Sequence, residues 1–153
     1  MTVIAYDGEF CAIDSGMIAG TTIHQMRKWW VHNNREVVTG AGNASHVVAL
    51  AEWYMGGATL DKFPPAVLFH KDAELIVIDI DGVRRFEASP FPLNHGITKC
   101  AFGEGRDFAY GALAVGASAE EAAIAACQYS PACAEPVHRF RWDDDGVICY
   151  ANR

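Results

Sequence analysis

The sequence has little positive charge, no long apolar run and no closely paired cysteines. Its 153 residues include 12 Lys and Arg against 19 Asp and Glu, a formal net charge of −7 at pH 7. A nucleic-acid-binding protein needs a basic face, so this composition argues against a nucleic-acid partner. No apolar run approaches the roughly 20 residues of a membrane-spanning helix, and the N-terminus lacks the basic and apolar regions of a signal peptide. We therefore expect a cytoplasmic protein with no membrane partner.

Cysteine usage points to a reducing compartment. The five cysteines are an odd number and contain no Cys-x-x-Cys pair: Cys11, Cys100, Cys127, Cys133 and Cys149. This pattern is typical of reduced, mostly buried thiols rather than of a disulfide framework. Because the cysteines and the six histidines are scattered along the chain, we expect no metal site and no cofactor.

Linkers, internal repeats and low-complexity segments are also missing, which predicts a single domain over residues 1–153. A hydrophobic content of 51% is enough to fill a sizeable core. Strand patterns come first, followed by one helix, more strands, two helices in succession and a final pair of strands. This order predicts the α+β class with mostly antiparallel sheets.

The first fifteen residues carry the strongest local signal. Two apolar segments, Thr2 to Tyr6 and Glu9 to Ile13, are joined by Asp7-Gly8, the dipeptide that a type I′ hairpin turn prefers. We expect this hairpin to lie inside a sheet, which would hold the chain terminus rigidly. If Met1 is removed, Thr2 becomes an N-terminal threonine close to Asp14. Its hydroxyl could then act as a nucleophile with its own α-amine as the base.

Three short motifs resemble the proteasome β-type subunits and the proteolytic subunit of the bacterial two-component, ATP-dependent ring protease. They are the segments 2–8 with 12–15 (TVIAYDG and AIDS), 39–44 (TGAGNA) and 101–109 (AFGEGRDFA). The resemblance is strongest to short bacterial or bacteriophage proteasome-like proteins. It implies the four-layer αββα sandwich of the N-terminal nucleophile (Ntn) hydrolases. It also implies a threonine peptidase that acts on peptides and assembles into a homo-oligomeric ring.

The resemblance assigns roles to individual residues. Thr2 matches the catalytic nucleophile and Asp14 the acid beside it. Lys28 is the best match for the lysine that accompanies this acid, although Arg27 is adjacent and could fill the same position. A glycine that forms the oxyanion hole matches Gly42, or Gly40 in an alternative register.

Two departures from the family pattern affect the supporting residues. Glu104 stands where the family's Gly-Ser-Gly segment has a hydroxyl, and Ser130 stands where the family has an aspartate. These departures favour an alternative function, a catalytically silent scaffold or structural component that could be phage-associated. A third reading of the residues is an amidase that acts on small acyl amides.

Periodicity and capping signals predict the remaining elements. Asn43 should cap a helix that ends at about Met55, and Ser118 with Glu121 forms a capping box for another. The expected helices are 43–55, 106–115 and 118–128. The expected strands are 26–31, 36–39, 66–70, 74–80, 83–87, 137–142 and 147–150, with 17–23 an irregular strand or loop and 88–100 a loop. Trp29 and Trp30 are expected in the core, and four large side chains are available for subunit contacts: Trp29, Trp30, Trp53 and Phe63.

Overall fold

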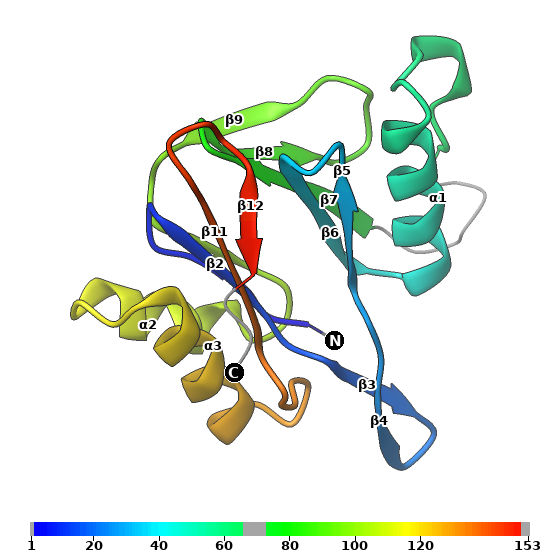
Figure 1. The fold of residues 1–153 in the computed structure, drawn as a ribbon. Coiled ribbons are helices and arrows are strands. Elements are labelled where there is room, and N and C mark those ends of the chain that lie inside the picture. Colours follow the sequence, from blue (N-terminus) through cyan, green and yellow to red (C-terminus); the bar gives the residue numbers. More distant parts are fainter. Residues whose placement is uncertain (1, 66–72, 151–153) are drawn as a thin grey trace.

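A computed structural model describes residues 2–65 and 73–150 of the chain (Figure 1). Within these ranges, antiparallel strands form two five-stranded sheets and one two-stranded ribbon, and three α-helices pack beside them. The α+β class predicted from the sequence is thus confirmed. None of the helices in the described ranges is long and apolar enough to cross a membrane.

The predicted N-terminal hairpin lies in the middle of the first sheet. Strands β1 (Ile4–Tyr6) and β2 (Phe10–Ile13) pair antiparallel, with Ile4 opposite Ile13. The sheet order is β10-β1-β2-β11-β12, where β10 is Cys100–Phe102, β11 is His138–Trp142 and β12 is Ile148–Tyr150. All three residues of β1 are buried. Neighbours on both edges of the hairpin therefore hold the beginning of the chain in place.

The type I′ turn predicted at Asp7-Gly8 is wrong. The backbone N–H of Asp7 donates to the carbonyl of Phe10, so the two central residues are Gly8 and Glu9. Only Gly8 has a positive φ, of 105°, whereas a type I′ turn needs a positive φ at both central residues. The Asp7 carboxylate accepts the N–H groups of Glu9 and Phe10. Asp7 thus stabilises the turn through its side chain.

The second sheet has the order β5-β6-β7-β8-β9. Its strands are β5 (Trp29–His32), β6 (Glu36–Gly42), β7 (Ala73–Asp79), β8 (Gly82–Phe86) and β9 (Leu93–Gly96). The continuous apolar run in β7 is buried from Leu75 to Ile78, as expected for a strand covered on both faces. The loop predicted over 88–100 is wrong in part because β9 and the start of β10 lie within it. The strand predicted over 66–70 lies outside the described residues.

Three apolar clusters connect the sheets and helices. One cluster draws buried residues from both five-stranded sheets, including Ile4 and Phe140 of the first and Ile76 of the second. A second joins the first sheet to α2 (Arg106–Ala114) and α3 (Ala119–Tyr129). The third joins the second sheet to α1 (Ala44–Met55). In Figure 1, α1 accordingly lies on the opposite side of the molecule from α2 and α3.

The helix caps follow the sequence closely. The side chain of Asn43 accepts the N–H of His46 at 3.0 Å at the start of α1. At the start of α3, the Ser118 hydroxyl accepts the N–H of Glu121 while the Glu121 carboxylate accepts the N–H of Ser118. This reciprocal pair is the predicted capping box. Both helices therefore begin where local hydrogen bonding satisfies their first N–H groups.

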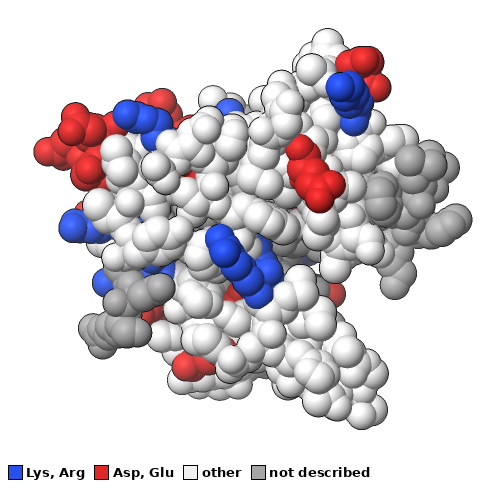
Figure 2. Space-filling view, turned by 45° about the vertical axis from the view of Figure 1, so that its right-hand side comes forward, with Lys and Arg blue, Asp and Glu red and all other residues white. Residues whose placement is uncertain are grey.

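A two-stranded ribbon replaces the irregular segment expected over 17–23. Strands β3 (Gly16–Ala19) and β4 (Thr22–Gln25) pair with each other and project from the body of the molecule (Figure 1). Residues 16–25 include no charged side chain. Figure 2 shows a face on which charged residues are sparse and this projection carries none. Because β4 is exposed throughout, no core periodicity was available to predict it.

Of the four large side chains considered for subunit contacts, two are buried and two are half-buried. Trp29 and Trp53 are each only 8% exposed. Trp29 packs edge-on against Phe140 at a centroid distance of 4.9 Å, and Trp53 does the same with Phe63. Trp30 and Phe63 also pack against the cluster beneath α1. Trp29 and Trp53 therefore belong to the core, whereas Trp30, also expected there, and Phe63 are half-buried at its edge.

Candidate active site

A buried ion pair lies at the end of the N-terminal hairpin. The Nζ of Lys28 is 2.9 Å from Oδ1 and 3.0 Å from Oδ2 of Asp14. Lys28 is 7% exposed and Asp14 is fully buried. Buried charges in proteins are paired, and this pair brings together two of the three residues expected to share a site.

Arg27 does not occupy the lysine position. Its side chain is exposed, its Nε donates to the carbonyl of Trp29 at 2.9 Å, and its guanidinium lies 4.0 Å above the Trp29 ring. Successive residues of an extended chain point to opposite sides, so only one of the two cations can face Asp14. The hydroxyl of Thr39 donates to the carbonyl of Lys28 at 2.7 Å. This hydrogen bond holds the lysine backbone against β6.

Three backbone N–H groups complete the surroundings of Asp14. Its Oδ1 accepts the N–H of Val3 at 3.0 Å, and its Oδ2 accepts those of Gly16 and Ala134, each at 3.1 Å. A side chain at position 16 would approach Ala134 to 2.7 Å, so Gly16 allows these two segments to meet. The carboxylate is therefore fixed from four directions, counting Lys28, and cannot turn toward solvent.

Thr2 and Lys28 line one cavity of about 230 Å³, whose other walls come from β3, β5, the end of β6 and the start of α1. Thr2 is 4% exposed and immediately precedes Val3, whose N–H binds the Asp14 carboxylate. Gly40 and Gly42 line the same cavity. Apolar side chains make up most of the remaining wall: Met17, Ile18, Met26, Trp30, Ala44, Val47 and Val48. The cavity thus joins a hydroxyl and an ammonium group to an apolar surface.

The end of β6 forms an open backbone edge at this cavity. The pairing of β6 with β5 ends at Thr39, while its pairing with β7 continues to Gly42. Residues 40–42 therefore have no strand partner on the side of β5 in the described structure. Gly42 has a φ of 106°, a conformation that favours glycine. Gly40 has a different role, because a side chain there would approach the carbonyl of Glu74 to 2.5 Å and Val47 to 2.7 Å.

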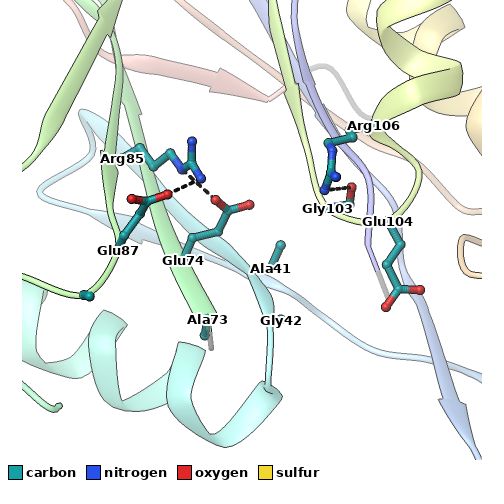
Figure 3. Close-up of a pocket in the computed structure, with 10 residues that line it drawn as sticks. Ala41, Gly42, Ala73, Glu74, Arg85, Glu87, Gly103, Glu104 and Arg106 are labelled. Atoms are coloured by element: carbon teal, nitrogen blue, oxygen red, sulfur yellow. Dashed lines mark hydrogen bonds and ion pairs between the residues drawn. The ribbon is translucent and has the colours of Figure 1, made fainter. Parts of the chain in front are cut away.

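The other two predicted support residues lie outside this cavity. Glu104 is exposed and lines a neighbouring cavity together with Gly42, Gly103 and Arg106 (Figure 3). Ser130 is buried at the end of α3, where its hydroxyl accepts the N–H of Ala132 at 3.2 Å. Neither residue is among the described residues that line the cavity of Thr2 and Lys28. The structure therefore brings together Thr2, Asp14, Lys28 and Gly42, but places Glu104 and Ser130 around them.

The cysteines nearest the ion pair are not poised as nucleophiles. Burial, with a further contribution from the Asp14 charge, raises the pKa of the Cys127 thiol to about 12. The same two causes raise the pKa of Cys133. The nucleophilic form of cysteine is the thiolate, so these side chains remain thiols near neutral pH. All five cysteines are free.

Sequence reasoning missed the groups that position the predicted residues. Thr39 binds the carbonyl of Lys28, and the N–H groups of Gly16 and Ala134 bind Asp14. Any residue except proline can supply a backbone N–H, so these donors cannot be recognised from residue types. Ala134 is also 120 residues from Asp14 in the sequence. Gly16 was the one available signal, because a glycine next to an Asp-Ser pair permits a close approach of another chain segment.

Comparison with known proteins gives a structural match. No protein-family model matches the chain, and a search of curated proteins finds no similar sequence. Among solved structures, a Thiobacillus denitrificans protein, BPH, in complex with epoxomicin matches with a TM-score of 0.66. The match covers 100% of both chains at 15% sequence identity. Epoxomicin is a proteasome inhibitor. The chain has a proteasome-like fold. In this fold the hairpin of β1 and β2, which directly follows Thr2, lies in the interior of the first sheet.

Proposed function

We propose that this protein is a threonine-type Ntn hydrolase, a peptidase whose nucleophile is Thr2 after removal of Met1. The observation that supports this most strongly is the buried contact of Lys28 Nζ with Asp14 Oδ1, the same oxygen that accepts the N–H of Val3. It holds a cation close to the peptide that follows Thr2. Thr2 and Lys28 also line one cavity. Such an arrangement suits a hydroxyl that must lose a proton during attack.

The proposed reaction has two steps that share one intermediate. The Thr2 Oγ attacks the carbonyl carbon of the substrate amide, and its proton passes to the free α-amine of Thr2. The C–N bond then breaks, the leaving amine takes this proton, and an ester remains on Thr2. In the second step, water loses a proton to the same amine and attacks the ester, which releases the acid and restores the hydroxyl. An α-amine has an ordinary pKa of about 7.7–8.0, which suits a base near neutral pH.

Gly42 is the proposed oxyanion donor. It lines the cavity with Thr2, and it lies on the part of β6 that lacks a partner toward β5. A backbone N–H at this position would stabilise the negative oxygen of the tetrahedral intermediate. Gly40, the alternative, lies two residues further inside the strand, where the packing of Val47 and Glu74 accounts for the absence of a side chain.

A peptide substrate fits the shape of the cleft. The free edge of residues 40–42 lies on one side of the cavity, and Met17 and Ile18 of β3 lie on the other. An extended peptide could add hydrogen bonds to either strand, as peptides do at exposed sheet edges. The apolar wall favours an apolar side chain on the acyl side of the scissile bond.

The same proposal includes the Ntn sandwich and a ring assembly. The two facing sheets with α1 on one side and α2 and α3 on the other correspond to the αββα order. We propose that identical chains form a homo-oligomeric ring, which would enclose the site and limit access to unfolded peptides.

One observation favours the alternative of a silent scaffold. Glu104, at the place of a supporting hydroxyl, is exposed and lines a neighbouring cavity rather than the cavity of Thr2. In this alternative the fold is kept for assembly alone, and the ion pair of Asp14 and Lys28 serves only stability.

Intact-mass measurement before and after incubation with epoxomicin tests the proposal. We expect the purified protein to lack the mass of one methionine and to gain the mass of one inhibitor. It should also hydrolyse a peptide–aminocoumarin amide with an apolar residue before the coumarin. Retention of Met1 by all molecules, with no adduct and no hydrolysis, would support the scaffold instead.

A further inference from the structure

A second, charged cavity adjoins the cavity of Thr2. It has a volume of about 420 Å³, and Ala41 and Gly42 line both cavities. The two cavities therefore lie on either side of the end of β6. Gly103, another lining residue, sits against the carbonyl of Thr2 so closely that a Cβ at position 103 would collide with it. The proposed nucleophile and oxyanion donor thus lie at the junction of an apolar and a charged space.

Two charged walls face each other across this second cavity. On one wall, Arg85 of β8 pairs with Glu74 and Glu87. On the other, Glu104 and Arg106 flank the start of α2, and Arg106 reaches back toward the carbonyl of Gly103 (Figure 3). Three carboxylates against two guanidinium groups give this lining a net charge of −1.

The excess negative charge of the cavity lies on the wall around Arg85. Glu74 and Glu87 share the single guanidinium of Arg85, so this group of three side chains has a net charge of −1. Arg106 is 58% exposed and has a second carboxylate, Asp107, at 3.8 Å. The N-terminus of α2 carries a partial positive charge, but Glu104 lies immediately before its cap residue, Gly105. A cation that enters the cavity therefore meets carboxylates whose attraction the arginines only partly cancel.

The position of the cavity defines which part of a substrate would enter it. A scissile carbonyl held between Thr2 and Gly42 has its acyl side chain on one side and its leaving amine on the other. Because the apolar cavity suits the acyl side chain, the charged cavity faces the leaving amine. A further cavity shares Glu74, Arg85 and Arg106 with it and continues to His95 and Tyr110, so a long side chain has room to extend.

We propose that this charged cavity selects a lysine or arginine side chain on the leaving-group side of the scissile bond, with Glu87 and Glu104 as the specificity-determining residues. The inference rests on the proposed peptidase function. It adds to that function a substrate class, peptides with an apolar residue followed by a basic one. The selection is electrostatic, because an added charge several ångströms away in a partly solvated site changes binding by about three- to tenfold.

The test compares quenched fluorescent peptides that are identical except for Lys, Gln or Glu directly after the cleaved bond. We expect kcat/KM to fall in the order Lys, Gln, Glu, with a Lys-to-Glu ratio of about tenfold. Mass spectrometry of the products confirms which bond is cleaved. Glu87→Lys should lower the ratio below one, and the milder Glu104→Gln should lower it by about threefold. Asp144→Lys is the matched control, since it makes the same charge change in an exposed turn and should leave the ratio unaltered.

The possible failures are distinguishable. Hydrolysis of the aminocoumarin amide by the wild-type protein, with equal rates for the Lys, Gln and Glu peptides, overturns the inference and leaves the peptidase proposal intact. A preference for Glu overturns it as well. An equal change of the ratio in Glu87→Lys and Asp144→Lys would show that overall charge, not this cavity, causes the preference. No hydrolysis of any substrate removes the peptidase proposal and the inference together.

Discussion

The backbone N–H of Gly105 donates a hydrogen bond to the carbonyl of Thr2 at 3.1 Å. This bond ties the second residue of the chain to the start of α2, more than one hundred positions away. The N–H of the same peptide group, which belongs to Val3, donates to the Asp14 carboxylate. The carbonyl of Val3 in turn accepts the backbone N–H of Asp14. The backbone of the proposed nucleophile is thus fixed by contacts that do not use its hydroxyl.

Replacement of Thr2 should therefore remove activity without unfolding the protein. We expect Thr2→Ala to reduce hydrolysis of the aminocoumarin amide by at least 10³-fold, since covalent catalysis is lost. Its melting temperature should stay within a few degrees of the wild type. Thr98→Ala, which truncates an exposed threonine, is the matched control and should retain full activity. Substantial activity in Thr2→Ala would exclude Thr2 as the nucleophile.

Loss of Lys28 should affect stability as well as activity. Lys28→Met leaves the fully buried Asp14 carboxylate with its three N–H donors but without its cation. Removing one partner of a buried ion pair costs about 3–5 kcal/mol, and we expect the lower end because the donors remain. Denaturant unfolding of Lys28→Met and of the exposed control Lys99→Met measures this difference. A loss below about 0.5 kcal/mol, as expected for the control, would contradict a structural role for the pair.

Gly103 and Gly111 offer a matched pair of glycine substitutions. Gly103 has a φ of 87°, and a side chain there would collide with the Thr2 carbonyl. We expect Gly103→Ala to cost about 1–3 kcal/mol and to reduce activity by displacing Thr2. Gly111 lies inside α2 with no atom near its added Cβ, so Gly111→Ala should stabilise the protein by about 0.5–1 kcal/mol. Chemical denaturation of both variants, alongside peptide hydrolysis, separates these effects.

Protonation of Glu36 should lower the free energy of unfolding at acidic pH. Burial alone would raise the pKa of Glu36, but hydrogen bonds from His32, Arg84 and Tyr54 outweigh it and hold the pKa below its ordinary value of 4.5. A lowered folded-state pKa means that this contribution is complete above about pH 4.5 and is lost as the pH falls through the folded-state value.

The measurement is the free energy of unfolding between pH 7 and pH 3. The wild type should lose more stability over this range than Glu36→Gln, which has no carboxylate to protonate. Parallel curves for the two proteins would show that Glu36 makes no pH-dependent contribution.

The proposed ring should be visible by sedimentation. A homo-oligomer has a mass that is a whole multiple of 16.7 kDa, and we expect such a species at micromolar concentration. Since Trp29 and Trp53 are buried, we expect contacts between chains to use exposed apolar side chains such as Phe108, Val115 and Tyr129. A monomer under these conditions would contradict the proposal.

Local signals predicted the fold well where a few neighbouring residues decide the structure. The caps at Asn43 and Ser118 depend on hydrogen bonds over three residues, so the starts of α1 and α3 agree with the prediction. The strand β9 was missed because its residues are exposed or half-buried and follow two prolines. It forms only because β8 offers it an edge, which is information from elsewhere in the chain.

In the candidate site, too, local motifs predicted some residues, whereas the positions of others depend on distant parts of the chain. Thr2, Asp14 and Gly42 were assigned from short motifs near turns and strand ends. The choice between Arg27 and Lys28 required the orientation of a single residue relative to a carboxylate on another element, which adjacent positions in the sequence do not reveal. The separation of Glu104 and Ser130 from the Thr2 cavity likewise depends on how the loop before α2 and the end of α3 pack.

The hydrogen bond from Ala134 to Asp14 has a consequence for the timing of synthesis. The carboxylate obtains its full set of partners from positions 3, 16, 28 and 134. A growing chain on the ribosome can form the first three contacts early, but the fourth only after nearly nine-tenths of the protein has been made. The environment of Asp14 is therefore complete only in a nearly finished chain. An unfinished chain, in which other segments are still unfolded, lacks it.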